Sequence, residues 1–277
     1  MTEIGGGATD FAVAMPGGET DVRLSWAAVT DVGRKRRANE DSFIARSPIF
    51  AVADGMGGHL SGDLASAAVV NRLNEEITTD FVPPQLIEHA LEAATADIDI
   101  ISGDSDLGVG TTVTGAVLTL IDGQPHFAIF NIGDSRVYQF EKNDLRQVSI
   151  DHSLVQELVD SGEISKAQAS KHPDGNIITR AVGFRSQPTP DFWMVALHPG
   201  LRLLICSDGL TGELDDKRIR LHMAAGLTVQ ETASALVDAA LAAGGKDNVT
   251  VVVVEVVETP VYEAPKRSVP RTGPKAR

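Results

Sequence analysis

The pattern of apolar and polar residues predicts three long helices and a larger number of strands. Helical spacing is clearest at 61–77, where Ala65, Val69, Leu73 and Ile77 recur at every fourth position. Apolar runs rich in β-branched residues, which are typical of buried strands, fill much of the remaining chain. The other helical stretches lie at 84–101 and 228–243, and the strand-like runs lie at 22–30, 42–53, 111–120, 126–132, 135–141, 191–196, 201–206 and 248–257. Because helices and strands do not alternate strictly, this order favours an α+β fold with mainly antiparallel sheets over a doubly wound parallel sheet.

Four aspartates stand at the ends of strand-like runs that are far apart in the sequence. Asp54 and Asp208 each follow an apolar run, and Asp41 and Asp247 each precede one. If these strands are neighbours, the carboxylates meet at one edge of a sheet, where like charges raise each other's pKa unless cations neutralise them. Oxygen ligands of this kind suit Mg²⁺ or Mn²⁺ rather than Zn²⁺. The sequence therefore predicts a divalent metal site.

Three further motifs bear on this site. The basic segment 33–37 directly precedes Asn39-Glu40-Asp41, and an arginine there would hold a phosphate dianion against the metal, although a solvated basic turn is the alternative. Asp54 is followed by Gly55, whose backbone carbonyl can approach a ligand closely. Asp134 lies in a predicted hairpin turn between strands, where capping of backbone N–H groups is favoured over metal binding.

Composition narrows the class of protein. The 277-residue chain is 43% hydrophobic and carries a net charge of −14, which indicates a globular protein and disfavours sequence-independent binding to nucleic acid. Its one cysteine, Cys206, excludes an internal disulfide and is typical of a reducing cytoplasm. No run approaches the roughly 18 apolar residues of a membrane span, and neither a signal peptide nor a coiled-coil pattern is present. These features predict a cytoplasmic monomer.

The ends of the chain differ from its middle in composition. Residues 1–20 are rich in Gly, Thr and Ala and are expected to form a flexible leader, and residues 21–257 a single domain. Residues 258–277 are basic and proline-rich, which predicts a disordered tail. A docking segment for an acidic partner is the alternative interpretation of that tail.

The motifs together carry a resemblance to a known family. In chain order they are Asn39-Glu40-Asp41, Asp54-Gly55-Met56-Gly57-Gly58, Gly110-Thr111-Thr112, Gly133-Asp134-Ser135-Arg136, Ser207-Asp208-Gly209 and Asp247-Asn248-Val249-Thr250. Over about residues 22–256 the chain resembles the metal-dependent protein serine/threonine phosphatases (PPM or type 2C), in their bacterial branch. The resemblance implies a sandwich of two mainly antiparallel β-sheets flanked by helices, with two Mn²⁺ or Mg²⁺ ions in a cleft at one end.

The resemblance also implies roles for individual residues. Asp54 would bridge the two ions, with the Gly55 carbonyl on one of them, and Asp208 and Asp247 would be further ligands. Glu40 and Asp41 would hold metal-bound waters, and Arg36 would bind the phosphate. The activity implied is hydrolysis of phosphoserine and phosphothreonine in proteins by a metal-bridging hydroxide, which would reverse the action of a cognate Ser/Thr kinase.

Two departures from the family pattern leave roles open. Met56 stands where some members carry a histidine proposed as general acid, so His59, His152 or a metal-bound water would have to supply the proton. A third ion would require an aspartate within 102–108, for which Asp106 is the candidate chosen.

Two other functions compete with a general phosphatase. One is a catalytically silent binding module, which the complete set of carboxylates disfavours. The other is a phosphatase dedicated to one regulatory phosphoprotein. The sequence does not distinguish such an enzyme from a general phosphatase.

Overall fold

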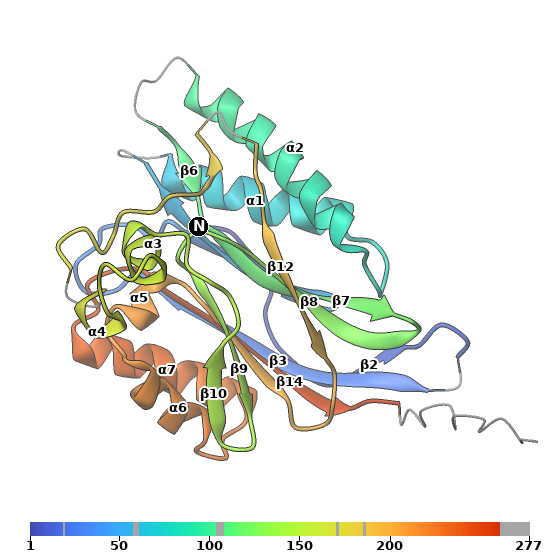
Figure 1. Ribbon diagram of the computed structural model, residues 1–277. Coiled ribbons are helices and arrows are strands. Elements are labelled where there is room, and N and C mark those ends of the chain that lie inside the picture. The colour runs from blue at the N-terminus through green and yellow to red at the C-terminus, as the bar shows by residue number, and fades with distance from the viewer. Residues whose placement is uncertain (19, 58–60, 104–107, 170–171, 185–186, 261–277) are drawn as a thin grey trace, which may run out of the picture.

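The computed structural model consists of two β-sheets stacked face to face, with helices on both outer faces (Figure 1). It describes residues 1–18, 20–57, 61–103, 108–169, 172–184 and 187–260. This arrangement confirms the α+β class and the sandwich of two mainly antiparallel sheets.

The first sheet carries Asp41 and Asp54. Its main strands, in spatial order, are β1 (Glu3–Gly5), β4 (Asp41–Arg46), β5 (Ile49–Met56), β7 (Val113–Ile121), β8 (Gln124–Ile132) and β12 (Asp191–Ala196). Two short strands, β6 (Gly110–Thr111) and β11 (Val182–Gly183), continue it from the end of β5. Only the pairing of β1 with β4 is parallel within this sheet. The predicted strand at 42–53 is wrong as a single element, because Ser47 and Pro48 form a turn and proline cannot donate a ladder hydrogen bond.

The second sheet is antiparallel throughout. Its strands, in spatial order, are β10 (Asp144–Gln147), β9 (Arg136–Glu141), β13 (Arg202–Cys206), β14 (Val249–Glu258), β3 (Asp21–Asp31) and β2 (Ala8–Ala14). The C-terminal strand β14 therefore lies in the middle of the sheet, between β13 and β3.

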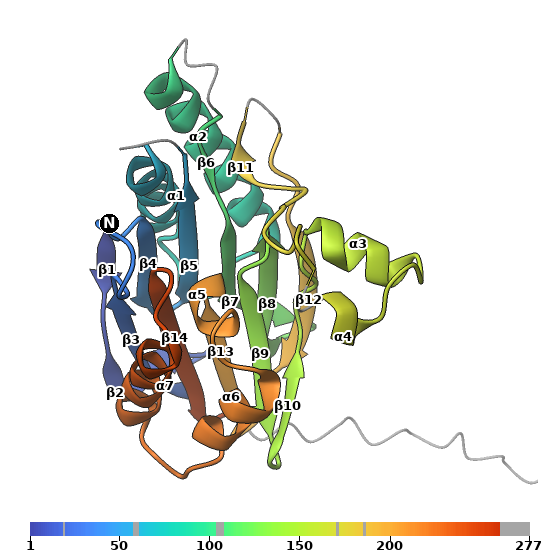
Figure 2. The same ribbon diagram turned by 90° about the vertical axis from the view of Figure 1, so that its left-hand side faces the viewer.

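Helices cover the outer face of each sheet. α1 (Gly62–Glu76) and α2 (Pro84–Ser102) pack on the first sheet, whereas α5 (Asp208–Thr211), α6 (Asp216–Met223) and α7 (Val229–Ala243) pack on the second. The three long helices thus agree with the sequence prediction to within two residues. α3 (Leu154–Asp160) and α4 (Lys166–Ala169) project from the edge of the sandwich opposite β1 and β2 (Figure 2). In the described part of the chain, no helix combines the length and apolar character needed to cross a membrane.

Apolar side chains fill three layers, one between the sheets and one beneath the helices on each side. In the middle layer Phe50 meets Trp26 and Phe127 edge to face, with ring centroids 5.2 and 6.5 Å apart. The Trp26 indole N–H donates to the Ala45 carbonyl at 2.9 Å, which ties β3 of one sheet to β4 of the other. The two sheets are therefore tied together at the end of β4 opposite Asp41.

The expectation of a flexible leader at 1–20 is wrong for residues 3–14. This segment adds one edge strand to each sheet, β1 beside β4 and β2 beside β3. Val13 is buried, and the Phe11 ring meets Trp26 edge to face at 5.4 Å. These two apolar anchors order a segment whose composition is otherwise that of a linker. Residues 261–277, which make up most of the predicted tail, lie outside the described residues.

Candidate active site

Both sheets contribute acidic residues to one end of the sandwich. Asp41 and Asp54 lie directly opposite each other on the antiparallel strands β4 and β5. Asp208 follows β13, and Asp247 lies just before β14, the strand that pairs with β13. The structure thus brings together the four aspartates that the sequence placed at strand ends.

Asp41 is the most deeply buried of these carboxylates. Its Oδ2 accepts hydrogen bonds from the Ser207 hydroxyl at 2.9 Å and the Thr250 hydroxyl at 2.6 Å, both on the second sheet. Its Oδ1 is also buried and has no hydrogen-bond partner. Burial raises the pKa of Asp41 from 3.8 to about 7, and the Asp208 and Asp247 carboxylates add to the rise against the effect of the two hydroxyls. An unpartnered buried carboxylate oxygen is costly unless a cation or a proton meets it.

The pKa values of Asp54 and Asp208 are raised in the same way. Burial raises the pKa of Asp54 well above its ordinary value, and the Asp41 and Asp208 carboxylates raise it further. Burial also raises the pKa of Asp208, with the next contribution from Asp247. The mutual repulsion indicates that these carboxylates lie near one another, although they come from four separate segments.

The end of β5 fits closely against the start of α1. A Cβ on Gly55 would overlap the Gly62 carbonyl, and a Cβ on Gly62 would come within 3.1 Å of the Glu40 carboxyl carbon. The Gly55 N–H donates to the Glu40 carbonyl at 3.3 Å. Two glycines therefore allow Glu40 and Gly55 to stand side by side at the edge of the acidic cluster. Burial raises the pKa of Glu40.

Arg36 points into the cluster from the basic segment. Its guanidinium contacts the Asp247 carboxylate at 2.5 Å, while 52% of the side chain stays exposed. Asn248 supports this arrangement, because its side chain accepts from the Glu40 N–H and donates to the Val32 and Ala38 carbonyls, each at 2.9 Å. Arg36 is thus a cation at the rim with room for a second anionic partner.

The Asp134 carboxylate also raises the pKa of Asp54, although the sequence analysis favoured a capping role for Asp134 over metal binding. Burial raises the pKa of Asp134 from 3.8 to about 7, and the Asp208 carboxylate makes the largest contribution of any charged group. A backbone hydrogen bond to the Asp134 carboxylate acts against this rise, so the predicted capping role and a place beside the cluster are compatible. A signal was available, because Asp134 follows the strand-like run at 126–132 just as Asp54 follows its own.

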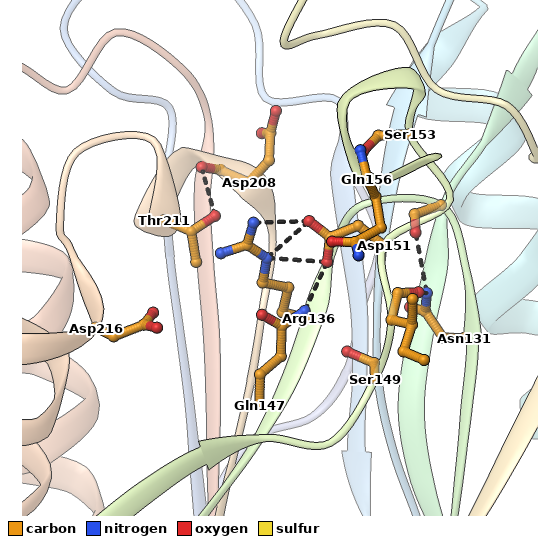
Figure 3. Close-up of polar contacts among 12 residues, drawn as sticks. Asn131, Arg136, Gln147, Ser149, Asp151, Ser153, Gln156, Asp208, Thr211 and Asp216 are labelled. Atoms are coloured by element: carbon orange, nitrogen blue, oxygen red, sulfur yellow. Dashed lines mark hydrogen bonds and ion pairs between the residues drawn. The ribbon is translucent and has the colours of Figure 1, made fainter. Parts of the chain in front are cut away.

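A buried ion pair lies beside Asp208. Arg136 contacts Asp151 through Nε at 3.0 Å and through its terminal nitrogen at 2.6 Å, as Figure 3 shows. The Gln147 amide donates to the same carboxylate at 2.7 Å. This pair joins β9 to the segment that leads into α3. No sequence pattern pointed to it.

The structure does not favour His152 as a proton donor. The ring is buried, Nδ1 accepts from the Gly133 N–H, and Nε2 faces Asp191, both at 3.2 Å. Burial lowers the pKa of His152, so the neutral form is favoured. The other candidates of the sequence analysis, His59 and the metal ligand Asp106, lie outside the described residues.

The oxygen atoms that the cluster offers as donors suit divalent ions that prefer oxygen ligands. As the described side chains stand, no three Asp, Glu, His or Cys residues converge closely enough to hold a metal. Asp247 is instead engaged by Arg36, and Asp41 by two hydroxyls. The unpartnered Asp41 oxygen and the raised pKa values of Asp54, Asp134 and Asp208 nevertheless indicate an excess of negative charge that a bound cation would offset. Carboxylate oxygens are the ligands that Mg²⁺ and Mn²⁺ prefer.

Comparison with known proteins supports this interpretation. A family model described as protein phosphatase 2C matches residues 34–243. The serine/threonine phosphatase Stp of Listeria monocytogenes is 37% identical over 239 residues, which cover 82% of this chain and 93% of that protein. The protein phosphatase PhpP of Streptococcus pneumoniae is 36% identical over 241 residues, which cover 83% and 96%.

Solved structures give the same result. The Mycobacterium tuberculosis phosphatase PstP/Ppp superposes with a TM-score of 0.75 at 34% identity, covering 85% of this chain and 99% of that one. A structure of the PstP catalytic domain in complex with two manganese ions gives a TM-score of 0.72 at 34% identity and the same coverage.

These likenesses define the class of the protein, which is that of the serine/threonine protein phosphatases. The chain belongs to the protein phosphatase 2C family, because the family model and relatives of 36–37% identity each cover most of it. The resemblance carried by the six motifs is thereby confirmed.

Proposed function

We propose that the protein hydrolyses phosphoserine and phosphothreonine in proteins with two divalent ions, Mn²⁺ or Mg²⁺, and that it reverses the action of a Ser/Thr kinase. The observation that carries the proposal is the cluster of carboxylates from both sheets with an exposed arginine beside it. The two manganese ions named for the PstP catalytic domain support it.

We propose the ligand roles that the family resemblance implies. Asp54 would bridge the two ions, with the Gly55 carbonyl, Asp208 and Asp247 as further ligands. Glu40 and Asp41 would act through waters, and we add Asp134 to the set because it shares the mutual repulsion. Asp106 is retained as a proposed ligand of a third ion. When bound, such ions would neutralise the carboxylates, polarise the phosphoryl oxygens and acidify water for attack on phosphorus.

The chain's own residues would position the substrate. Arg36 is paired with Asp247 and half exposed, so its guanidinium would turn to two phosphoryl oxygens as Asp247 engages a metal. The Ser207 and Thr250 hydroxyls would keep the Asp41 carboxylate oriented. No side chain of the described cluster supplies an evident proton to the leaving alkoxide, so we assign that role to water.

A covalent cysteine mechanism has no support in the structure. Burial raises the pKa of Cys206 to about 12, and the thiol lies fully inside the core beneath the helices of the second sheet. A neutral buried thiol is a poor nucleophile. We therefore propose direct attack by water. We further propose that the protein acts as a cytoplasmic monomer.

The test is hydrolysis of a phosphothreonine peptide by the purified protein with Mn²⁺, and then with excess chelator. We expect metal-dependent turnover, and we expect Asp54→Asn and Asp208→Asn each to lower kcat at least about a thousandfold, since each would remove a ligand of the ions that stabilise the negative charge of the transition state. Asp122→Asn in the exposed β7–β8 turn is the matched control and should be fully active. Substantial activity in both cluster variants, or turnover without metal, would refute the two-metal assignment.

A further inference from the structure

The segment between β10 and β11 leaves the sandwich and returns beside the acidic cluster. We call residues 153–180, which carry α3 and α4, the α3–α4 excursion. Its two ends are joined by hydrogen bonds of 2.8 Å, from the Leu154 N–H to the Ile177 carbonyl and from the Thr179 N–H to the His152 carbonyl. The α3–α4 excursion therefore begins and ends beside His152.

His152 is bonded twice to the turn that carries Asp134. Its backbone N–H donates to the Gly133 carbonyl at 2.8 Å, and the Gly133 N–H donates to its Nδ1 at 3.2 Å. Because Nδ1 accepts, the ring proton is on Nε2, which faces the Asp191 carboxylate at 3.2 Å. One imidazole thus connects the turn to an edge strand.

The turn has little freedom on its other side. Gly133 has a φ of +108°, and a Cβ there would come within 2.6 Å of the Thr112 side chain. The Thr112 hydroxyl also bonds Ser135 at 2.9 Å and accepts from the Asp54 N–H at 3.1 Å. The Asp134 turn is thus held between the His152 ring on one side and Thr112, which also bonds the Asp54 backbone, on the other.

Asp191 extends the connection back to the excursion. Its Oδ1 accepts from the Arg180 guanidinium at 3.0 Å, while Oδ2 faces His152. Arg180 is 48% exposed and lines a pocket with Ile132, which precedes Gly133, and Ile178. The hydrogen-bonded chain therefore runs from an exposed arginine of the excursion, through Asp191 and His152, to the Asp134 turn.

We propose that His152 is a positioning residue for Asp134, and that Asp191 and Arg180 couple its position to the α3–α4 excursion. The geometric part of the proposal, which is that His152 fixes the position of the Asp134 turn, rests on the hydrogen bonds alone. The consequence for metal binding rests on the proposed function, since it requires Asp134 to be a ligand. Residues that orient metal ligands in this way affect metal affinity without touching the ion.

Amide hydrogen exchange of residues 131–136, followed by mass spectrometry without metal, tests the geometric part. His152→Gln removes the acceptor for the Gly133 N–H, and Arg180→Gln removes the exposed end of the chain. We expect faster exchange in both. His152→Asn keeps an acceptor near the Nδ1 position but does not reach Asp191, so Arg180→Gln should have no further effect in that background. An equal effect of Arg180→Gln in both backgrounds would overturn the coupling.

Titration calorimetry with Mn²⁺ tests the consequence. We expect His152→Gln to raise the Kd for Mn²⁺ about 10- to 100-fold and Arg180→Gln to raise it about fivefold. Arg72→Gln, which breaks the ion pair of Arg72 with Asp97 between α1 and α2, is the matched control and should leave the Kd for Mn²⁺ unchanged. An unchanged Kd in a folded His152→Gln variant would overturn the positioning role. If the wild type binds Mn²⁺ but hydrolyses no phosphopeptide, the proposed function fails while the exchange result stands.

Discussion

The raised carboxylate pKa values predict that the protein without metal becomes less stable as the pH rises from 5 to 8. A group whose folded pKa exceeds its unfolded value stabilises the fold at low pH, and that contribution is lost as the pH rises towards the folded pKa. Asp41 and Asp134 both rise from 3.8 to about 7, so the loss falls inside this window. The pKa values of Asp54 and Asp208 are raised as well.

The size of the effect follows from these values. Between pH 5 and 8 a carboxylate with a folded pKa of about 7 loses about 2.5 kcal/mol of stabilisation, so Asp41 and Asp134 together lose about 5 kcal/mol. His152 acts in the opposite direction, because burial lowers its pKa and the fold gains stability as the unfolded histidine loses its proton. That gain is at most about 2 kcal/mol over the same range, so these three groups alone leave a net loss of at least about 3 kcal/mol, to which Asp54 and Asp208 add.

Urea unfolding of the chelated protein, followed by the fluorescence of Trp26 and Trp193, measures this loss. We expect Mn²⁺ at pH 8 to restore the stability, since an ion that binds only the folded protein raises its unfolding free energy. Asp134→Asn should remove about 2.5 kcal/mol of this pH-dependent loss, whereas Asp122→Asn should not change it. A flat or rising stability between pH 5 and 8 in chelator would refute the electrostatic description of the cluster.

Three other changes give clear expectations. Arg36→Ala should raise KM for a phosphopeptide about 10- to 100-fold, from the loss of charged hydrogen bonds, with Arg36→Lys recovering only part; an unchanged KM would exclude Arg36 from phosphate binding. Gly55→Ala should cost about 2 kcal/mol of stability and weaken Mn²⁺ binding because the new methyl overlaps Gly62, whereas Gly6→Ala, which meets nothing within 4 Å, should do neither. Deletion of residues 1–15 should lower the unfolding free energy by at least about 2 kcal/mol through exposure of the Val13 contacts; an unchanged urea midpoint would show that β1 and β2 contribute nothing.

Much of the fold could be predicted because its long elements have strong local patterns. Val249–Glu258 is a continuous apolar run buried on both faces for most of its length, and Val229–Ala243 buries one helix face, so the local pattern alone located both. The missed elements are short or polar. β10 and α4 have four residues each, too few for a period to emerge, and β2 is ordered by contacts with β3 rather than by its own composition.

The site was predictable where a carboxylate stood at the end of an apolar run. That pattern located Asp41, Asp54, Asp208 and Asp247, because strand ends of neighbouring strands meet. Asp134 was assigned otherwise because an aspartate in a hairpin turn has a competing local role. The contacts of Arg136 with Asp151 and of Gly133 with His152 join residues 15 and 19 positions apart across irregular segments, and no periodicity reports such pairs.

The central place of β14 in the second sheet also sets the order in which the molecule can be assembled. Residues 21–31 can pair with β2 as soon as they are synthesised, but their other edge must wait for Val249–Glu258, more than two hundred residues later. Pairing between such distant segments is slow, and an unpaired edge exposed meanwhile invites association with other chains. Asp247 arrives only with that last strand. A nascent chain therefore lacks part of its acidic cluster until Asp247 has been synthesised, so a molecule that stops short of β14 would lack one of the proposed metal ligands.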